Sequence, residues 1–410
     1  MGIEQREVWI TGIGLVTALG DGVEANWAAL TGTAQPTPIL DRDVVAPFVV
    51  HHVPEIDFST QIPKRGDQRQ MELWQRLGVY AAGLALDAAS ANDDEELKSA
   101  MDMIVAADGG ERDIETDNNL FTGLLTAEDR EALLIERLSN DLRPTLFLAQ
   151  LPNLVAGNIS IVHGVTGSSR TFMGEEAAGH DAIRIAHSRI AAGQSEICLV
   201  GGAFNARRED MVLLFEMDGY NWTEVETPVW QRSEAADGNG GLALGSMAAF
   251  LILEDAAHAK ARGVTPVAAL DAVVASRGKR TAGHVTSTLE QLWQTANVPT
   301  EGPLGVLSGA TGVAGSTAEE AEFLRELDNA AQLDVRAPGH LIGHGLESEF
   351  PVCLSLAALC ARDGQMYPDH GGRLTGTGEA LASANAIEQV AVISIGHWRG
   401  EGLGLVRKVS

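Results

Sequence analysis

Glu175 and Glu176 stand where the pattern of the chain predicts a strand that passes through a tight turn into a helix. The segment, residues 164–186, reads GVTGSSRTFMGEEAAGHDAIRIA. Many enzymes place a nucleophile at such a turn, because the helix dipole lowers the pKa of a thiol and stabilises developing negative charge. This turn has no Cys or Ser at the expected helix start. A carboxylate can act as a nucleophile, but the dipole stabilises its anion and makes it a poor base. We therefore expect a structural or gating role for Glu176, and a first-turn or solvent-facing position for Glu175.

The composition limits the classes of partner and compartment. The chain has 410 residues, 29 basic and 56 acidic, and a formal net charge of −27. Such a chain should repel nucleic acid and anionic membrane surfaces. The N-terminal sequence MGIEQREVWITGIG is typical of neither a signal peptide nor a membrane span. The three cysteines, Cys198, Cys353 and Cys360, are too few and scattered for a disulfide framework, so we expect buried thiols in a reducing, cytoplasmic setting.

Strand and helix patterns alternate along the whole chain, which predicts an α/β fold with helices covering mixed sheets. A chain of this length exceeds one ordinary core. The same order of strands and helices occurs twice, so we predict an internal duplication with halves at residues 1–255 and 256–410. The acidic stretch 93–136 is predicted to be a solvated surface with helices. A helix over STAEEAEFLRELDNAAQ is predicted to be capped by Ser316 or Thr317.

Several motifs, taken in order, resemble those of the β-ketoacyl-acyl-carrier-protein synthases, elongating type. VWITGIGLVTALGDGVEANWAAL resembles the opening strand, turn and helix of that family, and LPNLVAGNISIVHGVTGSS resembles the approach to the nucleophile. EICLVGGAFNA and PGHLIGHG follow at the expected distances, the latter similar to the second histidine motif. The likeness covers nearly the whole chain. It implies the thiolase fold, with two βαβαβαββ halves stacked as a five-layer αβαβα sandwich.

The same resemblance assigns positions to the family's catalytic groups. Those enzymes use a Cys nucleophile, two histidines and a Lys for decarboxylative condensation. Here Glu176 falls at the Cys position, Ala310 at the first histidine and Val335 at the Lys, while His340 retains the second histidine. In the C-terminal glycine loop, SIGHWRGEGLG, His397 falls where the family has a gating Phe. We expect Glu176 to accept hydrogen bonds from the backbone amides of its turn and to pair with His340.

A metal site is a weaker hypothesis. His340 and His344 together with Glu347 resemble a ligand spacing. The family's glycine-histidine motif explains the same residues, so no metal ion and no cofactor are expected.

The loss of three catalytic groups favours a non-condensing subunit, similar to chain-length factors that pair with an active synthase and shape its acyl tunnel. The expected partner is an active synthase in a heterodimer, or a second copy in a homodimer. The acidic chain would contact an acidic acyl carrier protein only indirectly. Three alternatives stay open: a malonyl-thioester decarboxylase, a divergent acyl-transferring enzyme that uses Glu176 and His340 as an acid–base pair, and a structural homodimer without an acyl ligand. Fatty acid and polyketide biosynthesis are both candidate pathways.

Overall fold

The strands form one long mixed sheet that divides into two halves of five strands each. The protein is seen in a computed structural model, which describes residues 5–107, 109–111, 113–141, 150–233, 238–329, 331–377 and 386–409. The strands of the first half are β1 (Val8–Thr17), β5 (Asp102–Ala107), β6 (Ser169–Met173), β7 (Ile197–Phe204) and β8 (Met247–Asp255). Those of the second half are β9 (Ala268–Ser276), β10 (Gly302–Leu307), β11 (Ala331–Arg336), β12 (Gln389–Ile395) and β13 (Glu401–Arg407).

The two halves have the same topology. The strands lie in the order β6-β5-β7-β8-β1 in the first half and β11-β10-β12-β13-β9 in the second. If the strands of each half are numbered one to five along the chain, both orders read 3-2-4-5-1. The halves meet where β1 pairs antiparallel with β9, Trp9 opposite Ala269 and Ile10 opposite Ala268. The predicted βαβαβαββ order is therefore present in both halves. β8 ends at Asp255, beside the boundary that we propose at residue 255.

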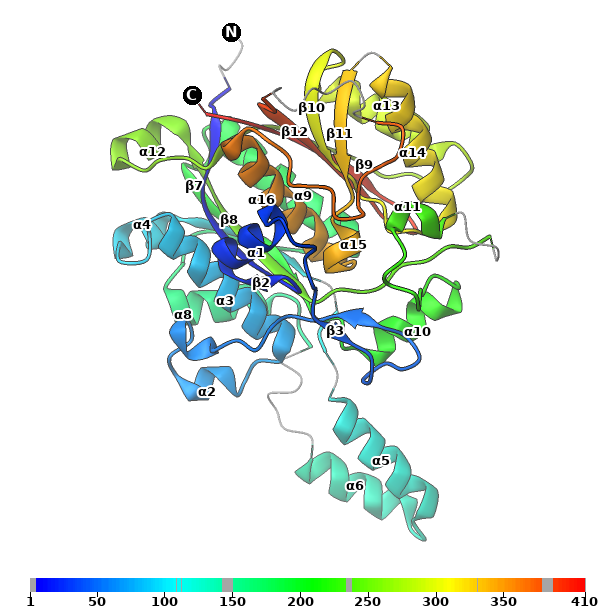
Figure 1. Ribbon diagram of the computed structural model, residues 1–410. Helices are drawn as coiled ribbons and strands as arrows, with labels where there is room; N and C mark the ends of the chain where they lie inside the picture. The colour runs from blue at the N-terminus through cyan, green and yellow to red at the C-terminus, as the bar shows by residue number, and fades with distance from the viewer. Residues whose placement is uncertain are drawn as a thin grey trace.

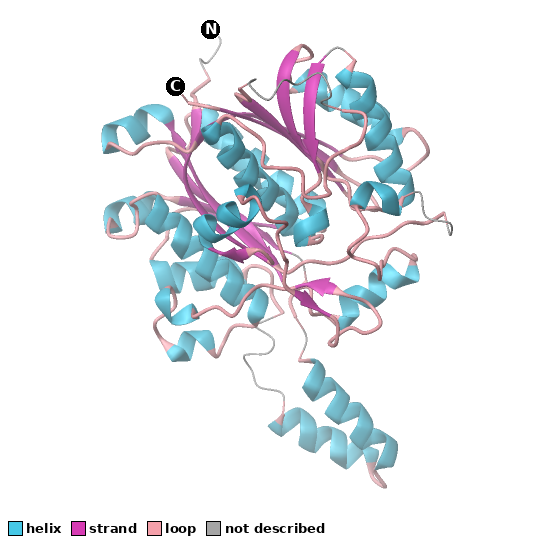
Figure 2. Cartoon of the chain, in the orientation of Figure 1, coloured by secondary structure: helices cyan, strands magenta, loops and turns pink. Residues whose placement is uncertain are grey.

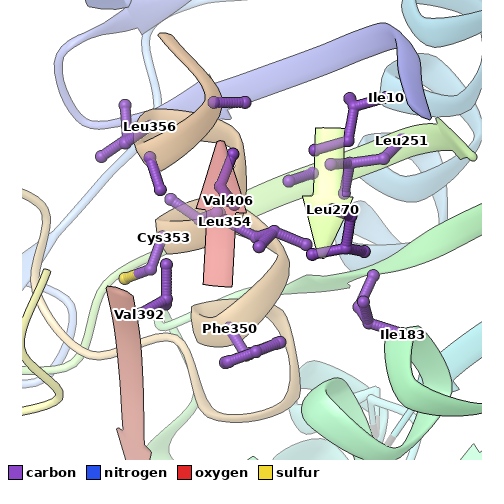
Figure 3. Close-up of a cluster of buried hydrophobic side chains, with 14 of the residues drawn as sticks. Ile10, Ile183, Leu251, Leu270, Phe350, Cys353, Leu354, Leu356, Val392 and Val406 are labelled. Carbon is purple, nitrogen blue, oxygen red and sulfur yellow. The ribbon is translucent and has the colours of Figure 1, made fainter. Parts of the chain in front are cut away.

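Two helices lie between the half-sheets and form the central layer. They are α9 (Glu176–Ala191), which packs on β5, β7 and β9, and α16 (Glu349–Asp363), which packs on β8, β12 and β13. Every residue of α16 from Glu349 to Ala361 is buried, which is typical of a helix enclosed on all sides. In Figure 3 the side chains of Phe350 and Leu354 lie in one cluster with Leu251 of β8 and Val392 of β12.

Outer helices cover both half-sheets and complete five layers (Figures 1 and 2). Those on the first half include α3 (Leu73–Ala88) and α8 (Leu154–His163), and those on the second half are α13 (His284–Thr295) and α14 (Ala314–Asp328). The predicted cap of α14 is wrong. The helix begins one turn earlier than expected, with Val313 at the N-cap position, and the Thr317 hydroxyl instead accepts a hydrogen bond from Gly312 N at 3.1 Å.

The remaining elements connect these layers. Further helices in the described ranges are α1 (Gly22–Thr31), α2 (Arg65–Gln68), α4 (Glu95–Ala100), α10 (Glu209–Met217), α11 (Val229–Arg232), α12 (Ala256–Arg262) and α15 (Gly339–Ile342), with 3₁₀ turns at Phe58–Thr60 and Leu346–Ser348. The short strands are β2 (Gly20–Asp21), β3 (Leu40–Asp41) and β4 (Val50–His51). No helix in the described ranges is both long and apolar enough to cross a membrane. The three cysteines are free and buried, as predicted.

A helical hairpin stands apart from the layered body. It consists of α5 (Ile114–Thr126) and α6 (Arg130–Asn140), which project away from the sheets in Figure 1. The hairpin lies largely in the acidic stretch predicted to be a solvated helical surface, and its helices have no buried residues. However, it also exposes apolar side chains, among them Phe121 (64%), Leu125 (78%) and Ile135 (61%).

Candidate functional site

Glu176 is the first residue of the central helix α9, and its side chain is buried. Two glycines allow other segments of the chain to pack closely against the start of α9. A Cβ atom on Gly179 would lie 2.4 Å from the carbonyl oxygen of Glu347, so only glycine allows the segment that follows α15 to approach α9 this closely. Gly400 has φ +89°, and a Cβ there would lie 3.0 Å from Cβ of Ala177. The two close approaches place two histidine-bearing loops over Glu176.

The carboxylate of Glu176 is held by two imidazoles. His344 donates its Nε2–H to Oε1 of Glu176 at 2.9 Å, and His397 donates its Nδ1–H to the same oxygen at 2.6 Å. All three side chains are buried. The other carboxylate oxygen, Oε2, has no hydrogen-bond partner among the described residues. The predicted hydrogen bonds from backbone amides to Glu176 are therefore wrong.

The charges in this cluster follow from burial and hydrogen bonding. Burial opposes ionisation of Glu176, but the hydrogen bonds and charge of His344 and His397 outweigh it and hold its pKa well below the usual range. Burial would lower the pKa of His344, but the hydrogen bond to Glu176 and the nearby carboxylates raise it. Burial prevails at His397 and lowers its pKa. These shifts favour an ionised Glu176 and a protonated His344, and they oppose a second positive charge on His397.

Each imidazole has a further polar neighbour behind it. The Thr311 hydroxyl lies 3.1 Å from Nε2 of His397, and Oε2 of Glu349 lies 3.8 Å from Nδ1 of His344. Glu349 is itself fixed by Gly345 N, which donates to the same Oε2 at 2.8 Å. The Thr311 contact orients the His397 ring toward Glu176, whereas Nδ1 of His344 has no hydrogen-bond partner among the described residues.

His340 lies outside this cluster. No hydrogen bond joins it to Glu176, and its ring packs against Gly371, where an added Cβ would lie 2.8 Å from Nε2 of His340. Burial, together with the positive charge of Arg232, lowers the pKa of His340 to about 4. The predicted pairing of Glu176 with His340 is therefore wrong, and His344 makes the contact instead.

Ala310 and Val335, at the positions predicted for the first histidine and the lysine, have side chains without a reactive or hydrogen-bonding group. Ala310 and Val335 are buried members of one apolar cluster in the second half. Val335 lies within β11, opposite Val306 of β10. Ala310 donates its backbone N–H to Oγ of Ser308 at 2.9 Å and precedes Thr311, which contacts His397. Ala310 thus borders the cluster without contributing to it.

His397 also borders an open cavity. Its ring stacks edge-on to Phe215 at 5.4 Å and lies 5.7 Å from the ring of Tyr220. A cavity of about 400 Å³ is lined by His397, Tyr220, Arg280 and Glu319, among others. Arg280 donates to the Gly396 carbonyl and to Glu401, and so holds the glycine loop that carries His397. A gating role for His397 remains a prediction, consistent with its place between the cavity and Glu176.

Glu320 supports this region from α14, and sequence reasoning did not identify it. It is fully buried and accepts hydrogen bonds from Oγ of Ser308 at 2.7 Å and from Gly309 N at 3.2 Å. Burial raises its pKa to about 7, although both hydrogen bonds act to lower it. Glu320 therefore holds the Ser308–Gly309 turn that leads to Thr311.

Raising the pH should lower the free energy of unfolding, because Glu320 must then ionise while it is buried. In the unfolded chain this carboxyl ionises near pH 4.5, whereas in the folded chain it stays protonated until about pH 7. The contribution of Glu320 to the free energy of unfolding, about 3 kcal/mol, is therefore complete below pH 4.5 and is lost as the pH rises to the folded pKa. Glu320→Gln should remove this part of the pH dependence, as measured by urea unfolding at pH 5 and pH 8. Glu322→Gln, on the exposed side of the same helix, is the control. Equal pH slopes for wild type and Glu320→Gln would contradict the assignment.

The residues that sequence reasoning missed at the site are Thr311 and Glu349, and His344 as the partner of Glu176. His344 had one signal in the sequence, because its spacing from His340 suggested metal ligands. The set that the described residues bring together is different: Glu176, His344 and His397 offer three ligand atoms within 4.8 Å of one another.

Comparison with known proteins places these features in context. A family model described as "Beta-ketoacyl synthase, N-terminal domain" matches residues 5–259. The chain is 26% identical over 263 residues to 3-oxoacyl-[acyl-carrier-protein] synthase 2 of Vibrio harveyi, covering 64% of this chain and 60% of that protein. It is 27% identical over 273 residues to nodulation protein E of Rhizobium leguminosarum bv. trifolii, covering 64% and 61%. The match thus spans about 60% of the length of these relatives.

Solved structures match over almost the whole chain. The ishigamide ketosynthase/chain length factor superposes with a TM-score of 0.80 at 19% identity, covering 99% of this chain and 100% of that one. A beta-ketoacyl synthase from Burkholderia phymatum STM815 superposes with a TM-score of 0.77 at 20% identity, with the same coverage. These likenesses confirm the predicted thiolase-like α/β fold.

Proposed function

The chain belongs to the beta-ketoacyl synthase family, and on that premise we propose that it is a non-condensing member that acts as a chain-length-factor-like partner of an active synthase. One observation carries the proposal. Glu176, which the family resemblance places at the position of the nucleophilic Cys, accepts hydrogen bonds from His344 and His397 through its carboxylate. We infer that this buried carboxylate occupies the point where an acyl group would be attached. Fatty acid or polyketide biosynthesis is the expected setting.

The arrangement disfavours catalysis by Glu176 itself. A general base needs a pKa near the working pH, and that of Glu176 lies far below it. An acyl–glutamate anhydride would also be far more labile than a thioester. Because Glu176 and His340 make no hydrogen bond, the acid–base pair considered as an alternative is not formed.

Decarboxylation of a malonyl thioester is also disfavoured. That chemistry would use two histidines beside the thioester, and Ala310 supplies no such group. The buried anion of Glu176 would repel the malonate carboxylate. A role in shaping the partner's pocket requires neither a pair of catalytic histidines nor a bound malonyl group.

A surface suited to a partner lies at the end of the first half-sheet. β6 is the terminal strand of the sheet order, and it exposes Met173 (64%). The adjacent helix α8 exposes Ile161 (67%). An open edge with exposed apolar residues is a liability unless another chain covers it. We propose that the partner synthase pairs here, and that it docks the acidic carrier protein in place of this chain of net charge −27.

Elongation should depend on the partner. The purified chain should not elongate an acyl thioester with malonyl-carrier protein above background, whereas adding a synthase with an intact Cys-His-His site should give products of defined length. Product amount and length are measured by mass spectrometry, with the synthase alone as the control. Elongation by this chain alone at ordinary synthase rates would overturn the proposal.

The interface can be tested in the same system. Met173→Asp would bury an unpaired charge at the β6 edge and should weaken association with the synthase about tenfold or more. The matched control is Met217→Asp on α10, where Met217 is 78% exposed and distant in sequence from β6. Loss of association with both variants, or with neither, would contradict pairing at β6.

A further inference from the structure

We propose that Glu176, His344 and His397 form a binding site for one divalent transition-metal ion of the zinc type. The three residues present a carboxylate oxygen, Nε2 of His344 and Nδ1 of His397 within 4.8 Å of one another. Two imidazoles and one carboxylate are a ligand set that zinc accepts, with a fourth position left open. This inference goes beyond the proposed function, because it concerns what the chain binds by itself.

The ligand atoms converge on the carboxylate of Glu176. Both nitrogens point at Oε1 of Glu176, at 2.9 Å and 2.6 Å. Ligand atoms about 2.0–2.1 Å from a tetrahedral zinc ion lie roughly 3.3 Å apart. An ion among them would therefore widen the two N···O distances by about 0.5 Å, and because the three ligand atoms span up to 4.8 Å, the two imidazole nitrogens would also have to approach one another by as much as about 1.5 Å. Oε2 of Glu176 has no partner among the described residues, so a second oxygen is free to contact the ion.

The neighbours behind the two rings match the outer layer of a metal site. Metal-binding histidines commonly use their second ring nitrogen to contact a carboxylate or another polar group, which fixes the ring orientation. Here the Thr311 hydroxyl lies at hydrogen-bond distance, 3.1 Å, from Nε2 of His397. Glu349 lies 3.8 Å from Nδ1 of His344, within ion-pair reach, but that nitrogen has no hydrogen-bond partner among the described residues. Both contacts lie on the side of each ring that faces away from Glu176.

Charge and access also suit a cation. Two buried carboxylates, Glu176 and Glu349, lie within hydrogen-bond or ion-pair reach of His344, so a doubly charged ion would find compensating charge. His397 lines the open cavity of about 400 Å³, so one of the two ligand rings borders that cavity. Calcium and magnesium prefer sites made wholly of oxygen, so the two nitrogens select a transition metal.

The test is the zinc content and zinc affinity of the chain by itself. The protein is purified without a polyhistidine tag, stripped with a chelator, reloaded with zinc and dialysed, and the metal is measured by plasma mass spectrometry. About one zinc per chain is expected, together with an anomalous peak at the cluster in crystals. His344→Asn and His397→Phe should each reduce the bound zinc at least tenfold, and Thr311→Val should weaken affinity about 10–100-fold. Phe is the residue that the family resemblance places at position 397.

The matched control is His340→Gln, which changes a buried histidine outside the cluster and should keep the zinc. Retention of zinc by His344→Asn and His397→Phe, loss of zinc from His340→Gln to the same degree, or a stripped wild-type chain that takes up no zinc would each overturn the proposal. Circular dichroism checks that every variant is folded. Because no synthase is present, failure here is distinguishable from failure of the partner-dependent function.

Discussion

Glu176→Cys will place a thiol at the start of α9 without producing a condensing enzyme. The helix dipole and the neighbouring His344 favour a thiolate there. However, Ala310 and Val335 supply neither the histidine nor the lysine that the family's chemistry uses. General acid–base groups typically contribute about 10²–10⁴-fold, so condensation by Glu176→Cys should stay at least that far below an intact synthase. The rate is measured with malonyl-carrier protein and an acyl thioester.

A second variant distinguishes missing groups from a closed pocket. Mass spectrometry of Glu176→Cys after incubation with acyl thioester shows whether the thiol is acylated. Glu176→Cys combined with Ala310→His should condense faster than Glu176→Cys alone if the missing histidine limits the rate. Condensation by the single variant at ordinary synthase rates would show that this chain lacks only its nucleophile, and would contradict the interpretation of a site retained for its shape.

Glu176→Ala should destabilise the fold strongly. The change leaves the buried ring of His344, whose pKa Glu176 helps to raise, without that carboxylate, and His397 without an acceptor. Removing one member of a buried pair typically costs about 3–5 kcal/mol. The free energy of unfolding is measured with a chelator present, so that only the metal-free network is compared. Glu176→Gln, which keeps an oxygen acceptor, should cost less.

Glu175→Ala is the neighbouring control. Glu175 is partly exposed, and its carboxylate lies 3.6 Å from Arg399, whose side chain is 61% exposed. Such a surface pair contributes about 0–1 kcal/mol. Equal losses in the free energy of unfolding for Glu175→Ala and Glu176→Ala would mean that the hydrogen bonds of Glu176 to the two histidines do not stabilise the fold.

The fold could be predicted from the sequence because its signals are spread along the chain. The alternation of strands and helices occurs twice, and the family motifs occur in the right order, so local errors such as the cap of α14 do not affect the topology. The position of Glu176 at a buried helix start could be predicted for the same reason. The exposed apolar side chains of the α5–α6 hairpin were not predicted, because the acidic composition of that stretch indicated only solvation.

The partner of Glu176 could not be predicted, because the choice between two histidines depends on where a short helix ends. His340 and His344 are four residues apart, which in a continuous helix would place them on one face. α15 ends at Ile342, and Gly343 follows with φ +73°, so His344 leaves the helical path and reaches Glu176. The contribution of His397 depends on the glycine loop packing against α9, a contact between residues 221 positions apart.

The burial of all three cysteines should make this chain slow to react with reagents that alkylate thiols. All three thiols are enclosed in the packed interior, and burial raises their pKa values, that of Cys360 to about 12. Thiolates are the reactive form, and almost none exist here near neutral pH. In a mixture with an active synthase, an electrophile that alkylates cysteine would therefore mark only the synthase. The labelling would then report on the accessible cysteines of the synthase alone, with no background from this chain.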